Sequence, residues 1–178
     1  AAYFKKAVEF DPNNKSGWVD DAELSLAQIN NKKEDIEAFV KKYPDSELTK
    51  IAVMYLAELA LESNDYATGD NYYKQLIGKY GSNDEEINFG YGQYLLTKIY
   101  ALNKKENKSK DDYRKGIELA NECLNIVKGS VNEASCYFYL SEFFLQTGDK
   151  TKANEYIDKA LKIHDRKSFR ELKEKINK

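Results

Sequence analysis

Helix-breaking residues are scarce in this sequence. Only 9 glycines and 2 prolines occur among 178 residues, which is few for this length and favours helices over a turn-rich β fold. Long apolar runs are missing as well, since no stretch approaches the roughly 18 residues of a membrane span. The composition still supports a packed core, because 42% of the residues are hydrophobic and 14 Tyr and 8 Phe supply large aromatic side chains.

Positive charge is not in excess. The formal net charge is −2, and no stripe of Lys and Arg rises above the acidic background. Nucleic-acid binding therefore has no electrostatic support. We expect neither nucleic acid nor direct membrane insertion among the interactions of this chain.

Residues typical of catalytic and metal sites are few. His164 is the only histidine and falls at a predicted helix end, so no Ser-His-Asp or Cys-His pair is expected. With one histidine, Cys123 and Cys136 cannot complete a four-ligand zinc site. We expect both to be buried free thiols; the alternative is a disulfide between neighbouring helices. No Gly-rich phosphate loop occurs, so the sequence predicts a non-enzymatic protein without cofactor or metal.

Three stretches share one pattern. They are DYATGDNYYKQL (65–76), DYRKGIELANEC (112–123) and DKTKANEYIDKA (149–160). Each begins with Asp, a good helix N-cap, so Asp65, Asp112 and Asp149 are predicted caps. Four residues later comes a small residue, which is Gly69, Gly116 or Ala153. Apolar or small residues continue at offsets of eight and eleven, and these offsets lie on one helical face.

Small residues also precede two of these stretches. Ala57 lies eight residues before Asp65, and Ser141 lies eight before Asp149. This spacing predicts antiparallel helix pairs with a small residue in each helix where the two cross, as in helical repeats. In this register Phe144 is expected to be buried between paired helices, and Phe144→Ala should cost about 3–5 kcal/mol.

Two junctions carry a family resemblance. Residues 11–18, DPNNKSGW, resemble the junction between repeats of the tetratricopeptide repeat (TPR) family, and residues 42–47, KYPDSE, resemble the junction of its bacterial cell-envelope members. The resemblance implies an all-α fold: an α-solenoid, a right-handed superhelix of antiparallel helix pairs. It implies four full repeats, with a half repeat first and a capping helix last. The expected segments are 1–12, 13–45, 46–82, 83–129, 130–165 and 166–178, in one helical repeat domain.

The corresponding helices are expected near residues 1–10, 16–30, 33–43, 46–63, 65–80, 84–104, 111–128, 131–147, 149–164 and 166–177. The repeat at residues 83–129 departs from the family because about twelve residues are inserted around 101–111, ALNKKENKSKD. We expect this insertion to extend one helix and then form a solvated loop; the alternative is a lysine-rich recognition loop.

The resemblance also implies a concave groove lined by the first helix of each pair. Transferred to this sequence, the partner-binding candidates are Val19, Glu23, Met54, Glu58, Glu62, Phe89, Gln93, Tyr100, Phe138, Glu142 and Leu145. Chaperone-binding members of the family place Asn after the crossing residue. In this sequence the corresponding positions of the four repeats hold Glu23, Glu58, Gln93 and Glu142. We call these positions a carboxylate ladder and expect it to attract a basic or polar segment.

Two functional hypotheses follow from this sequence. The first is an interaction or scaffold module that binds a protein segment in the groove. The alternative is the C-terminal helical accessory domain of a larger bacterial envelope enzyme, such as a thioredoxin-fold protein, because the chain begins Ala-Ala-Tyr-Phe inside a repeat and is expected to be a processed or excised piece. Self-association is a third possibility. The resemblance favours the envelope over the cytoplasm.

Overall fold

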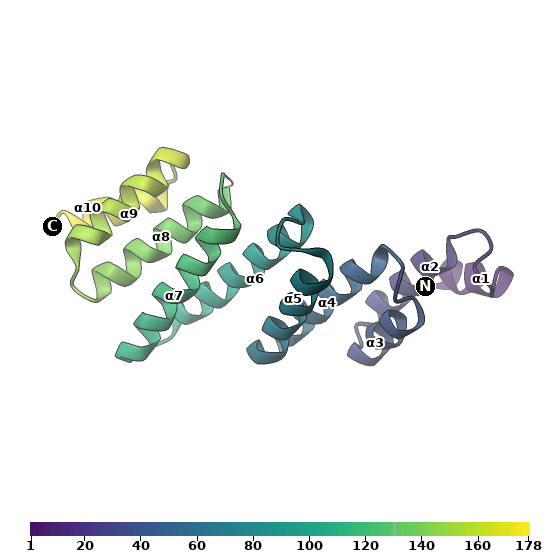
Figure 1. Cartoon of the computed structure of the whole chain (residues 1–178). Coiled ribbons are helices and arrows are strands. Elements are labelled where there is room, and N and C mark those ends of the chain that lie inside the picture. The colour runs from purple at the N-terminus through teal and green to yellow at the C-terminus, as the bar shows by residue number, and fades with distance from the viewer. Residues whose placement is uncertain (130) are drawn as a thin grey trace. The chain divides into compact units, whose positions relative to one another are not determined.

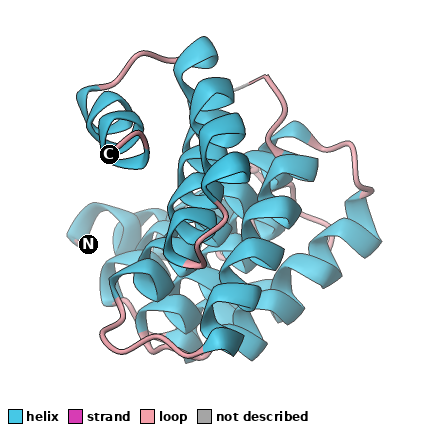
Figure 2. Cartoon of the chain, turned by 90° about the vertical axis from the view of Figure 1, so that its left-hand side faces the viewer, coloured by secondary structure: helices cyan, strands magenta, loops and turns pink. Residues whose placement is uncertain are grey.

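A computed structural model of the protein describes residues 1–129 and 131–178 (Figure 1). The described residues form ten α-helices and no strand (Figure 2). The helices are α1 (Ala2–Phe10), α2 (Val19–Asn30), α3 (Lys33–Lys42), α4 (Leu48–Glu62), α5 (Tyr66–Tyr80), α6 (Glu85–Lys104), α7 (Lys110–Ile126), α8 (Val131–Gln146), α9 (Lys150–Ile163) and α10 (Lys167–Ile176). The predicted all-α fold is confirmed, and each helix lies within about three residues of its predicted range.

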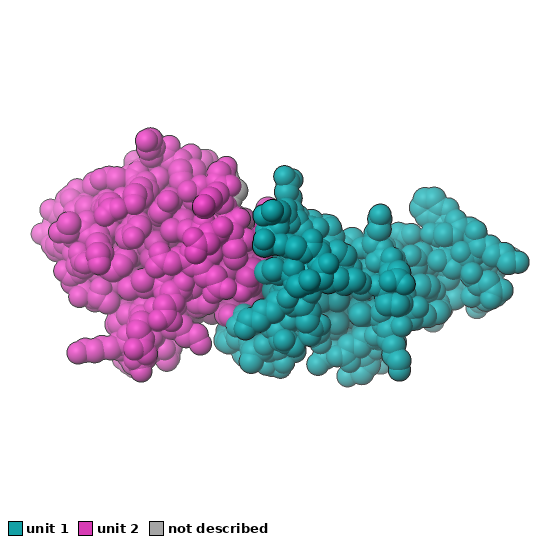
Figure 3. Space-filling view, viewed as in Figure 1, with its two compact units in different colours: residues 1–87 teal, residues 88–178 magenta. Residues whose placement is uncertain are grey.

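The chain divides into two compact units, residues 1–87 and residues 88–178 (Figure 3). The boundary falls in the first turn of α6. The units differ in charge: residues 1–87 contain 10 Lys and Arg against 17 Asp and Glu, while residues 88–178 contain 18 against 13. Their formal charges are therefore −7 and +5, a division that the net charge of −2 conceals.

The core of unit 1 lies where α2, α3 and α4 meet. Its buried residues are Leu24, Ala27, Ile36, Phe39, Ala52 and Leu56. Further along α4, Ala57 is fully buried, and Gly69 of the neighbouring helix α5 is buried as well. These are the two small residues predicted to lie at a helix crossing.

The first helix of unit 1 contributes nothing to this core. α1 contains no buried residue, and Tyr3 and Phe10 are each 87% exposed. The turn that follows leaves Trp18, the only tryptophan, 70% exposed. α1 packs against α2, yet most of its apolar surface faces solvent.

The α4–α5 and α8–α9 hairpins close with the same backbone hydrogen bonds. The N–H of Asp65 donates to the carbonyl of Ala60 (2.8 Å), and the N–H of Asp149 donates to the carbonyl of Phe144 (2.9 Å). A residue with positive φ precedes each aspartate: Asn64 at 60° or Gly148 at 88°. Both aspartates then cap the next helix, as predicted, by accepting a backbone N–H three residues later.

The third predicted cap is wrong. α7 begins at Lys110 and its N-cap is Ser109, not Asp112. Asp112 occupies the third helical position, where its carboxylate accepts the Ser109 N–H (2.8 Å) and completes a capping box. Because the inserted residues extend α6 to Lys104, the helix start shifts by three residues from the register of the other two stretches.

Small residues permit close helix packing in unit 2. A Cβ atom at Gly116 of α7 would overlap the ring of Phe143 on α8. Between α8 and α9, the Ser141 hydroxyl donates to the carbonyl of Ala153 (2.7 Å), and both residues are fully buried. The predicted crossing residues of the last pair therefore do meet.

The prediction that Phe144 is buried is wrong, because the neighbouring residue Phe143 is the buried one. Phe143 is fully buried, whereas Phe144 is half-buried and stacks on Tyr156 of α9, with ring centroids 5.5 Å apart. Adjacent helical residues point about 100° apart, and the α7–α8 packing turns Phe143 inward. The expected large cost of truncation belongs to Phe143.

The cysteines are buried, as predicted, but they are not free thiols. A disulfide joins Cys123 of α7 to Cys136 of α8. The less favoured of the two sequence-based alternatives is therefore the one that the structure shows. The bond links two neighbouring helices of unit 2.

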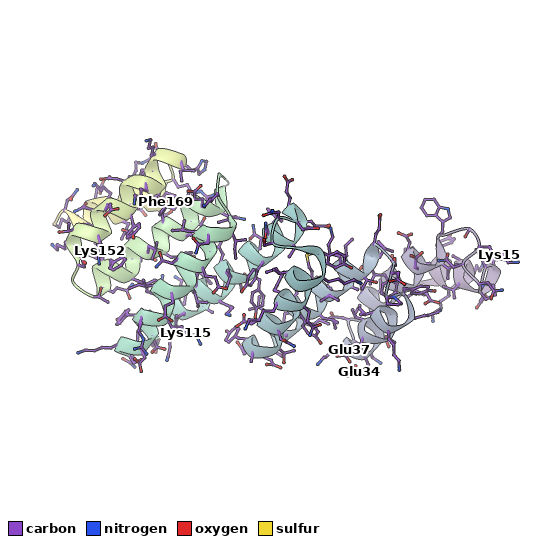
Figure 4. All side chains as sticks on the ribbon, in the orientation of Figure 1. Lys15, Glu34, Glu37, Lys115, Lys152 and Phe169 are labelled. Atoms are coloured by element: carbon purple, nitrogen blue, oxygen red, sulfur yellow. A yellow bond between two sulfur atoms is a disulfide. The ribbon has the colours of Figure 1, made fainter. Side chains whose placement is uncertain are left out.

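The last helix of unit 2 is well covered. Phe169, Leu172 and Ile176 of α10 are buried together with Ala134, Ile157 and Ala160 of α8 and α9. Phe169, labelled in Figure 4, stacks on Phe138 of α8 at a centroid distance of 5.0 Å. The opposite side of α10 is polar, as expected for a capping helix.

Candidate functional site

Among the described residues, no cluster of side chains is suited to hold a metal ion. No group of three or more His, Cys, Asp or Glu side chains converges within this part of the chain. His164 is exposed at the end of α9. Asp20 in the first turn of α2 accepts hydrogen bonds from the Asn14 amide and from the Ser46 hydroxyl (2.8 Å), so it links the start of α2 to the junction at residues 42–47. A membrane span is not among the described helices, none of which is both long and apolar enough.

In unit 1 the candidate residues of α2 are largely engaged. Val19 is buried, so its side chain is not available to a partner. Glu23 forms an ion pair with Lys42 of α3 at 2.6 Å. Beside this pair, α2 and α3 border a cleft of about 280 Å³ that Leu26 and Ala27 also line. The α2 face therefore offers a neutralised carboxylate beside a small cleft.

The candidate residues of α4 are more accessible. Met54 is half-buried, while Glu58 and Glu62 are exposed one helical turn apart. Although Glu58 is exposed overall, partial burial of its carboxyl group raises its pKa, and the charge of Glu62 adds to this effect. Like charges four residues apart on a helix repel. A cationic group of a partner would relieve this repulsion.

In unit 2 the candidate residues of α6 leave two aromatic rings in solvent. Phe89 is 62% exposed and Tyr100 is 51% exposed. Eleven residues separate them, so they lie on the same side of the helix about 16 Å apart. Between them, Gln93 is held by a hydrogen bond from its amide to the Asn132 side chain of α8 (3.1 Å).

The candidate carboxylate of α8 belongs to a polar network. Glu142 is half-buried, and the amide of Asn103 donates to it at 2.6 Å. The Asn103 side chain in turn accepts from Gln146 (3.3 Å). Burial raises the pKa of Glu142, an effect that the Asn103 hydrogen bond and then Lys175, Lys104 and Lys108 oppose.

Tyrosines surround this network. Burial, followed by the charge of Glu142 and then by Tyr100, raises the pKa of Tyr139 to about 12. The Nζ atom of Lys104 lies 5.6 Å from the ring centroid of Tyr100, within the range of a cation–π contact. The network thus combines one carboxylate with two phenol rings and nearby lysines.

The capping helix covers the remaining candidates of unit 2. Phe138 and Leu145 pack against the buried cluster of α8, α9 and α10 to which Phe169, Leu172 and Ile176 belong. Sequence reasoning predicted α10 as a cap but assigned Phe138 and Leu145 to an open surface. Both are half-buried in the structure, and one face of the Phe138 ring stacks on Phe169.

The four ladder positions therefore differ in chemistry. Glu23 is paired with Lys42, Gln93 with Asn132, and Glu142 with Asn103. Glu58 is the exposed carboxylate of the set, and Glu62 accompanies it. In unit 1 the candidate surface is acidic, whereas in unit 2 it is aromatic with lysines at its edge.

Comparison with known protein families gives no matching family model, and comparison with curated proteins gives no match. The resemblance to TPR proteins consequently stays a prediction that rests on the sequence motifs.

Proposed function

We propose that this chain is a non-enzymatic protein-interaction module built from TPR-like helix pairs, which binds a segment of a partner protein on the α2–α4 face of unit 1 or on the α6–α8 face of unit 2. The paired helices would be α2–α3, α4–α5, α6–α7 and α8–α9, with α10 as the cap. The solenoid arrangement and the bacterial origin stay predictions.

The repeated closure of the helix pairs supports the repeat part of this proposal. Two hairpins share the same hydrogen bonds and caps, and the turns that precede α3, α5, α7 and α9 each hold one residue of positive φ: Asn31, Asn64, Asn107 and Gly148. Contacts also link alternate helices, since α2 touches α4 and α8 touches α10. Stacked helix pairs with such contacts are typical of helical-repeat proteins.

One observation carries the binding part of the proposal. Phe89 and Tyr100 expose their rings on the same side of α6, and Tyr100 lies about one helical turn from Asn103, which binds Glu142. Exposed aromatic residues with convergent polar groups are typical of protein-binding surfaces. In unit 1, Glu58 and Glu62 add an acidic patch that favours a basic or polar segment.

A panel of labelled peptides with basic, polar or apolar composition would test this function by fluorescence anisotropy. The variants are Glu58→Lys with Glu62→Lys for unit 1, and Phe89→Ser with Tyr100→Ser for unit 2. A peptide bound on these faces should lose about tenfold in affinity in at least one double variant. The matched control is Glu34→Lys with Glu37→Lys on α3 (Figure 4), which makes the same charge change as the first variant.

The control residues take part only in exposed contacts, such as the Lys33–Glu37 ion pair, so the fold should tolerate the change. Glu142→Lys added to Glu58→Lys provides a further test of the ladder. If the panel contains a binder whose affinity none of these face variants changes, the proposed binding faces are wrong.

A further inference from the structure

A cleft that the candidate faces do not include opens in unit 2. Its volume is about 560 Å³, and it lies between the N-terminal half of α7 and the C-terminal end of α8. α7 lines it with Lys110, Tyr113, Arg114, Ile117 and Glu118, while Gln146 closes it from α8. The spacing of the α7 residues places them on one helical face. A cleft of this size accommodates a large side chain with its flanking backbone.

The cleft has an apolar wall and a basic rim. Tyr113 and Ile117 are half-buried and supply the apolar surface. Lys110 and Arg114 are exposed at the rim. Arg114 contacts Asp111 at 3.1 Å and Glu118 at 3.9 Å, but exposed ion pairs of this kind are weak and exchange readily. The guanidinium group therefore remains available to another carboxylate.

The segment that leads into α7 is rich in positive charge. Residues 104–115 contain six Lys and Arg and three acidic residues. One of the three, Asp112, already binds the Ser109 backbone in the capping box and the Lys105 ammonium group (2.8 Å). The Lys105 contact is the largest of the effects that lower the pKa of Asp112 to about 2. Lys115 extends the positive charge along the same half of α7 (Figure 4). This local positive charge has the same sign as the formal charge of unit 2 as a whole, which is +5.

We propose that the α7–α8 cleft and the basic segment before it together bind an acidic protein segment that carries a large apolar side chain. The apolar side chain would fill the cleft against Tyr113 and Ile117, and flanking carboxylates would pair with Lys110 and Arg114. The charge complementarity selects an acidic occupant, while the apolar wall selects a protein segment over a polyanion that has no apolar side chain. This surface goes beyond the faces of the proposed function, because it lies chiefly on α7.

Glu118 sets the direction of the bound segment. It lies eight residues from Lys110, about 12 Å along the helix, and it repels carboxylates at its end of the cleft. The acidic residues of the partner should therefore lie toward Lys110 and its apolar residue toward Ile117. A segment with the opposite order would place like charges together.

Two labelled synthetic peptides test this inference by fluorescence anisotropy with the full chain. Both are rich in Asp and Glu; one carries a central Phe and the other Ser in its place. We expect the Phe peptide to bind about tenfold more tightly than the Ser peptide. Lys110→Glu with Arg114→Glu should weaken Phe-peptide binding by about tenfold or more.

The matched control is Lys128→Glu with Lys162→Glu. It makes the same charge change beyond the C-terminal end of α7 and in the last turn of α9, away from the cleft, and should alter affinity by less than about twofold. A further variant, Ile117→Ser, should reduce the preference for Phe over Ser while circular dichroism verifies the fold. The candidate-face variants of Glu58 and Glu62 should leave Phe-peptide binding unchanged, which separates this surface from the proposed function.

Several outcomes would overturn the inference. One is the absence of measurable binding of the Phe peptide to the unmodified chain. Equal affinity for the Phe and Ser peptides, or an equal loss in the control variant, would reduce the surface to general electrostatic attraction. A short DNA duplex that binds as tightly as the Phe peptide, with the same loss in Lys110→Glu and Arg114→Glu, would make it a polyanion-binding surface instead.

Discussion

The terminal helices of the two units differ in how much of their apolar side is buried. α1 of unit 1 and α10 of unit 2 have 9 and 10 residues, and both have an apolar side. In α1 that side stays in solvent, whereas α10 buries Phe169, Leu172 and Ile176 against α8 and α9. The difference shows that an amphipathic pattern predicts a helix but not its burial, which requires a matching apolar surface on the neighbour.

The units also differ in charge and in covalent linkage. Unit 1 is acidic and contains no cysteine, while unit 2 is basic and contains the disulfide between α7 and α8. Unit 2 thus combines a covered terminal helix with a covalent link. We expect it to resist unfolding better than unit 1, and the following variants test this comparison.

The largest effect should come from Phe169→Ala. The substitution removes a buried ring that packs on Phe138, so it should lower the free energy of unfolding by about 3–5 kcal/mol. Denaturant unfolding followed by circular dichroism measures this loss. A loss below about 1 kcal/mol would mean that α10 does not cover unit 2 as described.

Removal of the disulfide should have the next largest effect. It closes a loop of 13 residues in sequence separation, and constraints of this length stabilise a fold by about 3 kcal/mol. Cys123→Ala with Cys136→Ala should lower the melting temperature of unit 2 and leave unit 1 unaffected. Thiol titration of the unmodified chain in denaturant without reductant should detect no free thiol; two free thiols would contradict the bond.

The same substitution should have opposite signs in the two units. Gly116→Ala in α7 forces a Cβ atom into the Phe143 ring and should cost about 1–3 kcal/mol. Gly78→Ala in α5 meets no neighbouring atom and should stabilise unit 1 by about 0.5–1 kcal/mol, because alanine is the better helix former. Thermal unfolding of both variants makes the comparison, and a neutral Gly116→Ala would show that the α7–α8 contact is loose.

Two carboxyl groups should give opposite pH dependence. Burial raises the pKa of Glu142 in unit 2, so the unfolded chain ionises first as pH rises, and the ionised group costs stability at neutral pH. Glu142→Gln keeps an acceptor for Asn103 and should stabilise the protein at pH 7 by less than about 1 kcal/mol. This gain should disappear below the unfolded pKa, where both states are protonated.

Asp84 in unit 1 is the matched case. The Ile87 N–H lowers its pKa, and Lys50 contributes as well, so its ionised form stabilises the fold above the unfolded pKa. That stability is lost as pH falls through the folded pKa, and Asp84→Asn should be slightly destabilising at pH 7. Melting temperatures measured across the acidic range test both signs, and parallel curves for the two variants would contradict them.

The smallest effect should come from Phe10→Ala in α1. The ring is 87% exposed, so the free energy of unfolding should change by no more than about 0.5 kcal/mol. Together with Phe169→Ala this variant measures the contrast between the two terminal helices. A cost above about 2 kcal/mol would show that the α1 ring is covered in solution.

Local sequence signals predicted the helices, most of their N-caps and the crossing points of paired helices. Asp65 and Asp149 were correctly predicted as caps, and Ser141 meets Ala153 as the crossing pattern required. The caps depend on residues within one helical turn of each other, and the Ser141–Ala153 contact joins residues 12 apart in sequence within one hairpin. The polar insertion likewise predicted the long α6. It did not predict that the N-cap of α7 is Ser109 and not Asp112.

The rest depends on packing between helices. Whether Phe143 or Phe144 turns inward is decided by the neighbour, because Gly116 leaves room for the Phe143 ring. The pairing of Cys123 with Cys136 and the cover of α10 over Phe138 and Leu145 also arise only when helices meet. The binding candidates were predicted from a family geometry, so their partners, such as Lys42 beside Glu23 and Asn103 beside Glu142, were not visible in the sequence.

The exposed position of Trp18 has a spectroscopic consequence. As the only tryptophan, it supplies a fluorescence signal that originates in one turn of unit 1. Its indole ring already faces water when the protein is folded, so its emission should shift little on unfolding and gives a small signal for the unfolding transition. The same property makes Trp18 a selective reporter, because a blue shift in its emission would signal that another surface has covered the turn before α2.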